Sequence, residues 1–454
     1  MLYAGFARRE ITPFWGVELT GWGYYLERRW REIHDPLYAT ALACSPDESG
    51  ESGGAIVVAL DLMVIDEAFT QRTRERIART LGLSPHTVLL TCSHSHNAPA
   101  AGGLLGVGAC DPLYEQWAAQ QAATAAILAW RDRQPARLRL ARTTTSGLTF
   151  NRTRPDGVVD DTLTVAVLET EGGEPFGVVV NFAAHPTVCT ELRPFAVSRD
   201  VPGMLCDRIE SAWPGCTAMY IQGACGDTNF RREFQDASRC REPAERLWTV
   251  VRHAVAIAEP SRSDTVAAIS RTVRLPTRRW TREEIEADRR EAERRLKTGD
   301  ISGWESTLGR AMTNRPRDMV ARHGGDEHKA VMAMCRFHME WTGRMLADFE
   351  RRPEELPTEV QGVRIGDWIT VSNAAELFSP FARQVRADSH WPWLMIACYA
   401  NGRIGYLPDA YDIRRRSYAA WQSPKYCDQF PFTERSGPEM VAGKLSVIDT
   451  LKDA

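Results

Sequence analysis

The sequence predicts a layered α/β fold, because apolar runs typical of buried strands alternate with amphipathic helical segments along the chain. Several of the strand-like runs are continuously apolar, which is typical of strands covered on both faces. The chain has 454 residues, of which 43% are hydrophobic and 25% charged, as in an ordinary globular protein with a deep core. Without a repeat or a low-complexity linker, we treat residues 1–454 as a single domain.

Seven apolar, β-branched runs bounded by turn residues are predicted as the strands. They are Ala55–Leu60, Thr87–Cys92, Leu163–Leu168, Val178–Phe182, Ala218–Gln222, Trp368–Val371 and Leu394–Tyr399.

Helices are predicted between these strands. One spans about Glu67 to Leu81. Another begins at Asp111-Pro112, where an N-cap residue precedes a first-turn proline. The apolar stripe expected on this second helix comprises Leu113, Trp117 and Leu128.

The region from Trp280 to Glu355, at about 280–355, is much more charged than the rest. A helix opens there with a capping box at Thr281 and Glu284. Its charges fall at i,i+3 and i,i+4 spacings that favour pairing on a wet surface. The pairs expected are Glu286 with Arg289 and Arg290, and Glu291 with Arg294. We expect a solvated helical excursion on the α/β body; a lid or an oligomer contact is the alternative.

Composition excludes several classes of partner. With 56 Lys+Arg against 59 Asp+Glu the net charge is −3, which leaves no basic surplus for nucleic acid. The most apolar stretch, Ala55 to Ile65, is too short for a membrane span and contains Asp61. The N-terminus has no basic start followed by an apolar segment, and the eleven cysteines include no CxxC pair. We therefore expect a cytoplasmic protein with free thiols that acts on a small molecule.

Three of the ten histidines follow predicted strands. His94 and His96 come directly after Thr87–Cys92, and alternate residues of an extended segment project to the same face. His185 follows Val178–Phe182, with Asp200 shortly after it. Two imidazoles on one side of a strand and a third elsewhere suit zinc, in a cleft beyond the carboxyl ends of the strands. The alternative is that these are ordinary core or surface histidines.

Three later segments carry further candidates. Asp227, in a glycine-rich turn after Ala218–Gln222, could accept a hydrogen bond from a metal-bound histidine. Cys225 is disfavoured as a nucleophile because no neighbouring residue is seen to lower its pKa. Glu376 would place a carboxylate where a helix begins, and Tyr406 lies in a glycine-flanked turn. Taken singly, a helix-start glutamate and a packed tyrosine are ordinary structural features.

In their order along nearly the whole chain, these segments resemble the neutral/alkaline (non-lysosomal) ceramidase superfamily. The blocks that carry the resemblance are Ile11-Thr12-Pro13 with Gly21-Trp22-Gly23, Ser93-His94-Ser95-His96, Asn151-Arg152, His185-Pro186-Thr187 with Asp200 to Gly203, Gln222 to Asp227, Glu376, and Asn401 to Tyr406.

The resemblance implies a zinc-dependent amidase with a ceramidase-like catalytic domain, in which layered mixed β-sheets are flanked by helices. It implies His94, His185, Glu376 and Tyr406 as the zinc ligands. It also implies that His96 faces the reacting water or substrate, and that Arg152 and Tyr418 line the pocket. Two imidazoles and a carboxylate would leave a position for a water molecule whose pKa zinc lowers to about 7.

The chain departs from the ceramidases in ways that change the expected substrate. Asn229 stands where they carry a serine, and asparagine cannot be a nucleophile, although it can donate a hydrogen bond to an oxyanion. The chain also ends soon after the catalytic body, without the C-terminal β-domain of that family. We therefore expect a metal-activated water to cleave a smaller, soluble N-acyl amine.

Three alternatives remain for this site. The first is an esterase, or a lactone or imide hydrolase, that uses the same zinc. The second is a metal-dependent lyase or biosynthetic enzyme on the same scaffold. The third is a non-catalytic binding protein, which is weakened because all four implied ligands are present.

Overall fold

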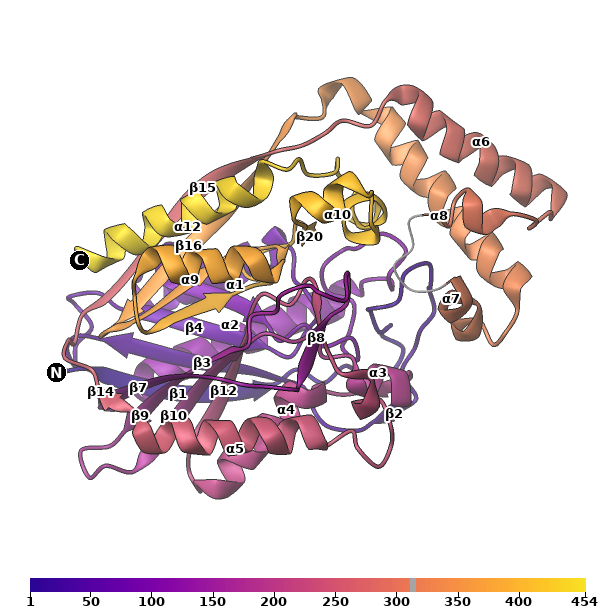
Figure 1. Cartoon of the computed structure of the whole chain (residues 1–454). Coiled ribbons are helices and arrows are strands. Elements are labelled where there is room, and N and C mark those ends of the chain that lie inside the picture. Colours follow the sequence, from indigo (N-terminus) through magenta and orange to yellow (C-terminus); the bar gives the residue numbers. More distant parts are fainter. Residues whose placement is uncertain (311–315) are drawn as a thin grey trace.

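The computed structural model describes residues 1–310 and 316–454, and its centre consists of two five-stranded mixed sheets packed face to face (Figure 1). The first has the order β5-β4-β3-β1-β6 and the second β12-β10-β9-β7-β14. The strands of the first are β1 (Tyr3–Glu10), β3 (Tyr38–Ser45), β4 (Ala55–Leu60), β5 (Val88–Cys92) and β6 (Gln134–Pro135). Those of the second are β7 (Arg137–Thr144), β9 (Thr162–Glu169), β10 (Pro175–Phe182), β12 (Thr217–Gln222) and β14 (Glu259–Pro260).

A third sheet of four strands, in the order β15-β16-β17-β19, packs beside these two. Its strands are β15 (Val266–Pro276), β16 (Glu355–Ile365), β17 (Trp368–Ser372) and β19 (Leu394–Ala397). The other strands form three two-stranded sheets. They join β2 (Glu32–Ile33) to β11 (Ala196–Val197), β8 (Thr149–Asn151) to β13 (Thr228–Phe230), and β18 (Glu376–Leu377) to β20 (Tyr406–Leu407).

Helices cover the outer faces of the sheets. The first sheet is covered by α1 (Glu67–Leu81) and α2 (Pro112–Arg131), and the second by α4 (Asp200–Ala212) and α5 (Glu242–Ile257). The third carries α9 (Ser379–Ser389) and α12 (Ser436–Lys452). The shorter helices are α3 (Val188–Leu192), α10 (Ala410–Arg414) and α11 (Ser423–Tyr426). This arrangement confirms the predicted layered α/β fold, and each of the seven predicted runs forms a strand.

The core between the first two sheets explains why those runs are apolar. Leu42, Val57 and Leu89 of the first sheet belong to the same buried cluster as Leu168 and Val179 of the second. Neighbouring residues such as Val58 and Leu90 point instead to the helices. Both faces of these strands are therefore buried.

The predicted apolar stripe of α2 was only partly right, since Trp117 packs against the core but Leu113 does not. Leu113 is 70% exposed, and the helix buries a row of alanines instead, namely Ala118, Ala122, Ala126 and Ala129. Small side chains let α2 lie close to the first sheet, where a Cβ on Gly5 of β1 would collide with the carbonyl of Ala129. The N-cap at Asp111 was predicted correctly, since its carboxylate accepts hydrogen bonds from the backbone of Leu113 and Tyr114.

Parallel strand pairs bring the ends of several strands to one place. Within the three large sheets, β4 and β5, β10 and β12, and β17 and β19 are parallel, whereas the other pairs are antiparallel. Backbone hydrogen bonds then join the sheets beyond these ends. Cys92 N donates to Tyr399 O at 3.2 Å, and Cys398 N donates to Gln222 O at 2.9 Å. The segments after β5, β12 and β19 are thus held side by side.

The charged region forms the helical arm at the right of Figure 1, with α6 (Arg282–Thr298), α7 (Pro316–Arg322) and α8 (Glu327–Ala347); residues 311–315 lie outside the described part. Its capping box is present, and Glu291 pairs with Arg294 at 3.0 Å. The inner face of the arm is nevertheless apolar. Trp280, Trp304 and Trp341 are buried in one cluster with Tyr24 and Tyr426 of the body. The excursion is therefore firmly packed and not merely a solvated surface element.

Across the described residues, no helix is both long and apolar enough to cross a bilayer.

Candidate active site

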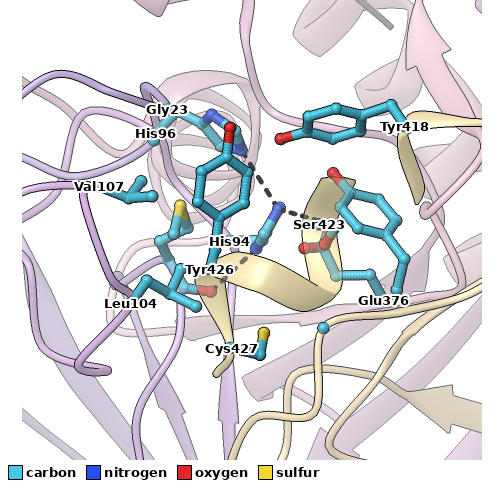
Figure 2. Close-up of a pocket in the computed structure, with 14 residues that line it drawn as sticks. Gly23, His94, His96, Leu104, Val107, Glu376, Tyr418, Ser423, Tyr426 and Cys427 are labelled. Carbon is cyan, nitrogen blue, oxygen red and sulfur yellow. Dashed lines mark hydrogen bonds and ion pairs between the residues drawn. The ribbon is translucent and has the colours of Figure 1, made fainter. Parts of the chain in front are cut away.

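Three imidazoles converge beyond the carboxyl ends of β5 and β10. Nε2 of His94 lies 3.1 Å from Nε2 of His185 and 3.2 Å from Nε2 of His96. Among the described residues these three form the group of histidine, cysteine and acidic side chains with metal-ligand spacing, their ligand atoms lying within 4.8 Å of one another. The predicted convergence of the three histidines is therefore present. Figure 2 shows two of them, His94 and His96, together with Glu376.

A carboxylate completes the cluster. Oε2 of Glu376 lies 3.4 Å from Nε2 of His94 and 3.6 Å from Nε2 of His185. This buried oxygen has no hydrogen-bond partner among the residues that the structure describes. Glu376 does not begin a helix, as the sequence suggested, because it lies in β18 and α9 starts at Ser379. Its strand pairs in parallel with β20, so that Glu376 is opposite Tyr406.

The spacing of these atoms fits a tetrahedrally coordinated metal ion. Ligand atoms bound to zinc at about 2.0–2.1 Å in a tetrahedron are separated by roughly 3.3–3.4 Å. The three separations among Nε2 of His94, Nε2 of His185 and Oε2 of Glu376 are 3.1, 3.4 and 3.6 Å, close to this value. A buried carboxylate oxygen without a donor is costly by itself, and a cation among these groups removes that cost.

Backbone carbonyls orient the two most buried imidazoles. Nδ1 of His94 lies 3.0 Å from Met63 O, and Nδ1 of His185 lies 2.8 Å from Cys225 O. A proton on each Nδ1 leaves the lone pair of Nε2 directed into the cluster. The predicted role of Asp227 as this partner was wrong. Its carboxylate instead accepts hydrogen bonds from Asn151 Nδ2, Ser379 N and Ser379 Oγ.

His94 adopts an unusual backbone conformation. Its φ is +66°, in the left-handed region. The segment that carries His94 and His96 is therefore not in the extended conformation that the sequence had predicted. The two imidazoles of that segment meet through this turn instead. The ring of Tyr399 stacks on that of His94 with centroids 3.9 Å apart and an interplanar angle of 22°. His94 N also donates to Leu62 O at 2.9 Å, so the strained residue is held from several sides.

The site favours neutral imidazoles. Burial lowers the pKa of His185 well below its ordinary value, and Arg152 and His94 lower it further. Burial likewise lowers the pKa of His96, with contributions from His94 and Arg152. Since a metal binds the neutral form of histidine, the surroundings prepare these rings as ligands or as bases.

Two adjoining cavities border the cluster. The smaller, of about 50 Å³, is lined by His94, His96 and Glu376, together with Tyr406 and Tyr418 (Figure 2). The larger, of about 360 Å³, shares His96, Tyr406 and Tyr418 with it, and also contacts Arg152 and Asn229. His185 lines neither cavity and is fully buried. The structure thus brings together the four implied ligands, His94, His185, Glu376 and Tyr406, with the predicted pocket residues His96, Arg152, Tyr418 and Asn229.

Arg152 and two phenols form one wall. Nη2 of Arg152 donates to Tyr406 Oη at 2.8 Å and to Gly226 O at 2.9 Å. Burial raises the pKa of Tyr406 well above its ordinary value, and it does the same for Tyr418. Both phenols therefore remain protonated near neutral pH and can donate hydrogen bonds.

Two other candidates do not reach the cavities. Cys225 is buried, its Sγ lies 2.9 Å from Tyr399 Oη, and burial raises the pKa of its thiol, which argues against a nucleophile. Asp200 lies at the start of α4, where its carboxylate accepts hydrogen bonds from Cys189 N and Val201 N. It therefore shapes the backbone and does not bind in the cluster.

Several residues that border the site were not predicted from the sequence. Met63 and Tyr399 contact His94. Arg28 donates a hydrogen bond to His96 O at 2.9 Å. Arg232 and Arg322 line the larger cavity. Each reaches the site from a distant segment without a local motif. Gly21 is the exception, since it belongs to the Gly-Trp-Gly block noted above, and a Cβ there would lie 2.8 Å from the imidazole of His96.

Comparisons with known proteins agree with this architecture. No protein-family model matches the sequence, and no curated protein matches it. Among solved structures, the neutral ceramidase from Pseudomonas aeruginosa matches with a TM-score of 0.70 and 18% sequence identity, over 100% of this chain and 74% of that one. A structure described as a ceramidase complexed with C2 matches with the same TM-score and identity, over 100% of this chain and 75% of that one. The chain has a ceramidase-like fold. The fold expected from the sequence blocks is therefore confirmed.

Proposed function

We propose that this protein is a zinc-dependent hydrolase that cleaves the amide bond of a small, soluble N-acyl amine. The observation that carries the proposal is the convergence of Nε2 of His94, Nε2 of His185 and the unpartnered Oε2 of Glu376. The ceramidase-like fold supports amide hydrolysis as the chemistry.

Exposure divides the roles of the three histidines. His94 and His185 are 1% and 0% exposed, so both are suited to bind an ion from the buried side of the site. His96 is less buried and lines both cavities, which places it on the side from which substrate arrives. We therefore propose His94, His185, Glu376 and Tyr406 as the zinc ligands, and His96 as the residue that moves protons.

The neighbouring side chains suit hydrolysis by an activated water. A zinc ion supplies Lewis acidity and lowers the pKa of a bound water to about 7. His96, neutral at this pH, can take a proton from the attacking water and deliver it to the leaving amine. Tyr418 and Asn229 offer hydrogen-bond donors toward a developing oxyanion, while Arg152 fixes the phenol of Tyr406.

The state of the cysteines bears on where such an enzyme works. All eleven cysteines are free, and most are buried. We propose a reducing, cytoplasmic environment for the protein, in agreement with a soluble substrate.

Metal analysis of the purified protein and its variants tests the assignment. We expect close to one zinc ion per chain, lost in His185→Ala and in Glu376→Gln, while His96→Ala keeps zinc but no longer hydrolyses a panel of N-acyl amines. His253→Ala, an exposed histidine on α5, is the matched control and should change neither. Zinc retained by His185→Ala would remove that ligand, and zinc lost by His96→Ala would make His96 a ligand.

A further inference from the structure

The larger cavity has a distinctive charge. Its charged lining consists of Arg152, Arg232, Arg322 and Glu191, which is a surplus of two positive charges in a chain whose net charge is −3. Most of the remaining lining is polar, including Thr187, Asn229 and Gln235. A cavity of about 360 Å³ is large enough for a small molecule, and this lining does not suit an apolar chain.

The arginine charges in this cavity are poorly compensated. Arg232, which lines the cavity and is an exposed residue, has no ion-pair or hydrogen-bond partner for its side chain among the described residues. Within the part of the chain that the structure describes, the carboxylate partner of Arg322 is Glu191, at 3.8 Å. Arg152 donates to neutral acceptors, a carbonyl and a phenol.

Some buried arginines elsewhere in the chain do pair closely with carboxylates. Arg199, for example, lies 3.1 Å from Asp35 and 2.9 Å from Asp207. Guanidinium groups that face a cavity without such partners are typical of sites that bind carboxylates or phosphates.

A fourth positive charge lies beneath the cavity. Arg28 is fully buried, packs its guanidinium 4.2 Å from the ring centroid of Trp22, and has no partner for Nη2 in the described part of the chain. Arg322 lies near the same indole, at 5.0 Å. Burial lowers the pKa of Arg28 to about 9, and repulsion from Arg322 contributes. This clustering of like charges is costly unless an anion is nearby for part of the working cycle.

The smaller cavity cannot take this role. Its volume of about 50 Å³ corresponds to a few water molecules and lies against His94 and Glu376. It suits an ion and the reacting water, whereas the bulk of a substrate must occupy the larger cavity. His96, Tyr406 and Tyr418 line both, so the scissile bond would lie at their junction.

We propose that the larger cavity binds a carboxylate or phosphate group through Arg232 and Arg322, so that the substrate is an N-acyl compound bearing a negative charge. The amide part of this statement rests on the function proposed above, whereas the anion site stands on the arginines alone. Glu191, as the acidic member of the lining, opposes the binding of an anion.

Binding of two simple anions tests the site without relying on turnover. Glutarate and inorganic phosphate are titrated calorimetrically into the zinc-loaded full-length protein. Arg232→Gln and Arg322→Gln should each weaken the binding of at least one anion about tenfold or more, because a charge-assisted hydrogen bond is lost. Glu191→Gln should strengthen it, which damage to the fold would not do.

Arg290→Gln provides the control, because it removes the same charge from an exposed helix position where Arg290 pairs loosely with Glu286 at 3.5 Å. Its anion affinity should equal that of the wild type. Equal affinities across all four variants, or no binding of either anion, would overturn the proposal. The anion that binds more tightly, glutarate or phosphate, shows whether the site prefers a carboxylate or a phosphate group.

Matched amides extend the test to catalysis. N-acetyl-β-alanine is compared with its neutral amide, and N-acetyl-O-phosphoethanolamine with N-acetylethanolamine. We expect the charged member of one pair to have at least a tenfold higher kcat/KM, with the advantage lost in Arg232→Gln. If neither pair is hydrolysed but anions bind as described, amide hydrolysis fails and the anion site stands. If the neutral members are cleaved as fast as the charged ones, the anion site fails as a substrate site.

Discussion

Gln222 donates a hydrogen bond of 3.0 Å from its amide nitrogen to the carbonyl of Ser93, the residue before His94. The same nitrogen donates at 2.9 Å to the carbonyl of Ala184, the residue before His185. One buried amide at the end of β12 therefore ties together the two loops that carry the proposed ligands. Its two donors match the two carbonyls, so the separation of the imidazoles depends on this side chain.

Gln222→Met, which keeps the size but removes both donors, should weaken zinc binding about 10- to 100-fold, as for other residues that orient ligands. It also leaves two buried carbonyls unpaired, at about 1–3 kcal/mol each. Competition with a chromophoric chelator measures the affinity. Gln71→Met on the exposed face of α1 is the control. Wild-type zinc affinity in Gln222→Met would show that the loops hold their spacing without it.

Gly21→Ala should reduce turnover while leaving zinc in place. A Cβ at this position would lie 2.8 Å from Nδ1 of His96, so the ring must move away from the junction of the cavities. Gly21 has φ +101°, which also strains any residue with a side chain. Gly16→Ala separates the two effects, because Gly16 has φ +98° and no atom within 4 Å of its Cβ position. We expect a loss of kcat in steady-state assays for Gly21→Ala alone. A similar loss in both variants would attribute the effect to backbone strain.

Much of this architecture could be predicted because its signals are local. The strand Ala55–Leu60 is continuously apolar since both of its faces are buried, and the histidines follow strands whose parallel neighbours end at the same edge. The resemblance implied Glu376 and Tyr406 as ligands of one zinc ion, but the pairing of their strands was not predicted, because no local pattern in the sequence marks a two-residue strand.

Other features depend on the folded chain and leave no local signal. The strand β15 has a mostly half-exposed face, so its sequence lacks the continuous apolar run that marked the others. Arg322 comes to the larger cavity from the helical arm, and its neighbour Trp22 is 300 residues earlier in the sequence. Arg322 and Trp22 come close because Trp280 and Trp341 pack the arm against the body. The spacing of charges on the outer face of the arm does not predict this packing.

Lys444 should make stability depend on alkaline pH. Its ammonium on α12 is fully buried and donates to Ser372 O at 2.9 Å, and burial lowers its pKa to about 8 from 10.5. Between these values the unfolded chain binds more protons than the folded one, so stability rises with pH in that window.

Relative to Lys444→Met, the wild type should therefore gain about 2 kcal/mol of unfolding free energy between pH 7.5 and 9.5. Urea unfolding of both proteins at the two pH values measures the difference. Lys452→Met, at a more exposed position of the same helix, should show no such change. A difference between wild type and Lys444→Met that does not vary with pH would mean that the buried amine is not titrating there.

Asp288→Asn should loosen the helical arm from the wall of the site. Oδ2 of Asp288 on α6 lies 2.6 Å from Nζ of Lys425, which is itself 4.6 Å from the ring centroid of Trp341. Both charged side chains are largely buried, at 12% and 4% exposure. Removing the carboxylate leaves a buried ammonium unpaired, which costs about 3–5 kcal/mol.

Lys425 directly precedes Tyr426, which lines the smaller cavity. The substitution should therefore destabilise the contact between the helical arm and the site. We expect lower protection of α6 and α8 in hydrogen–deuterium exchange and a reduced kcat, with zinc content unchanged. Glu286→Gln, which breaks an exposed pair with Arg290, should change stability by less than about 1 kcal/mol. Adding Lys425→Met to Asp288→Asn should restore part of the stability, because the uncompensated charge is then removed. If α6 in Asp288→Asn stayed as protected as in the wild type, the apolar contacts of the tryptophans would suffice to hold the arm.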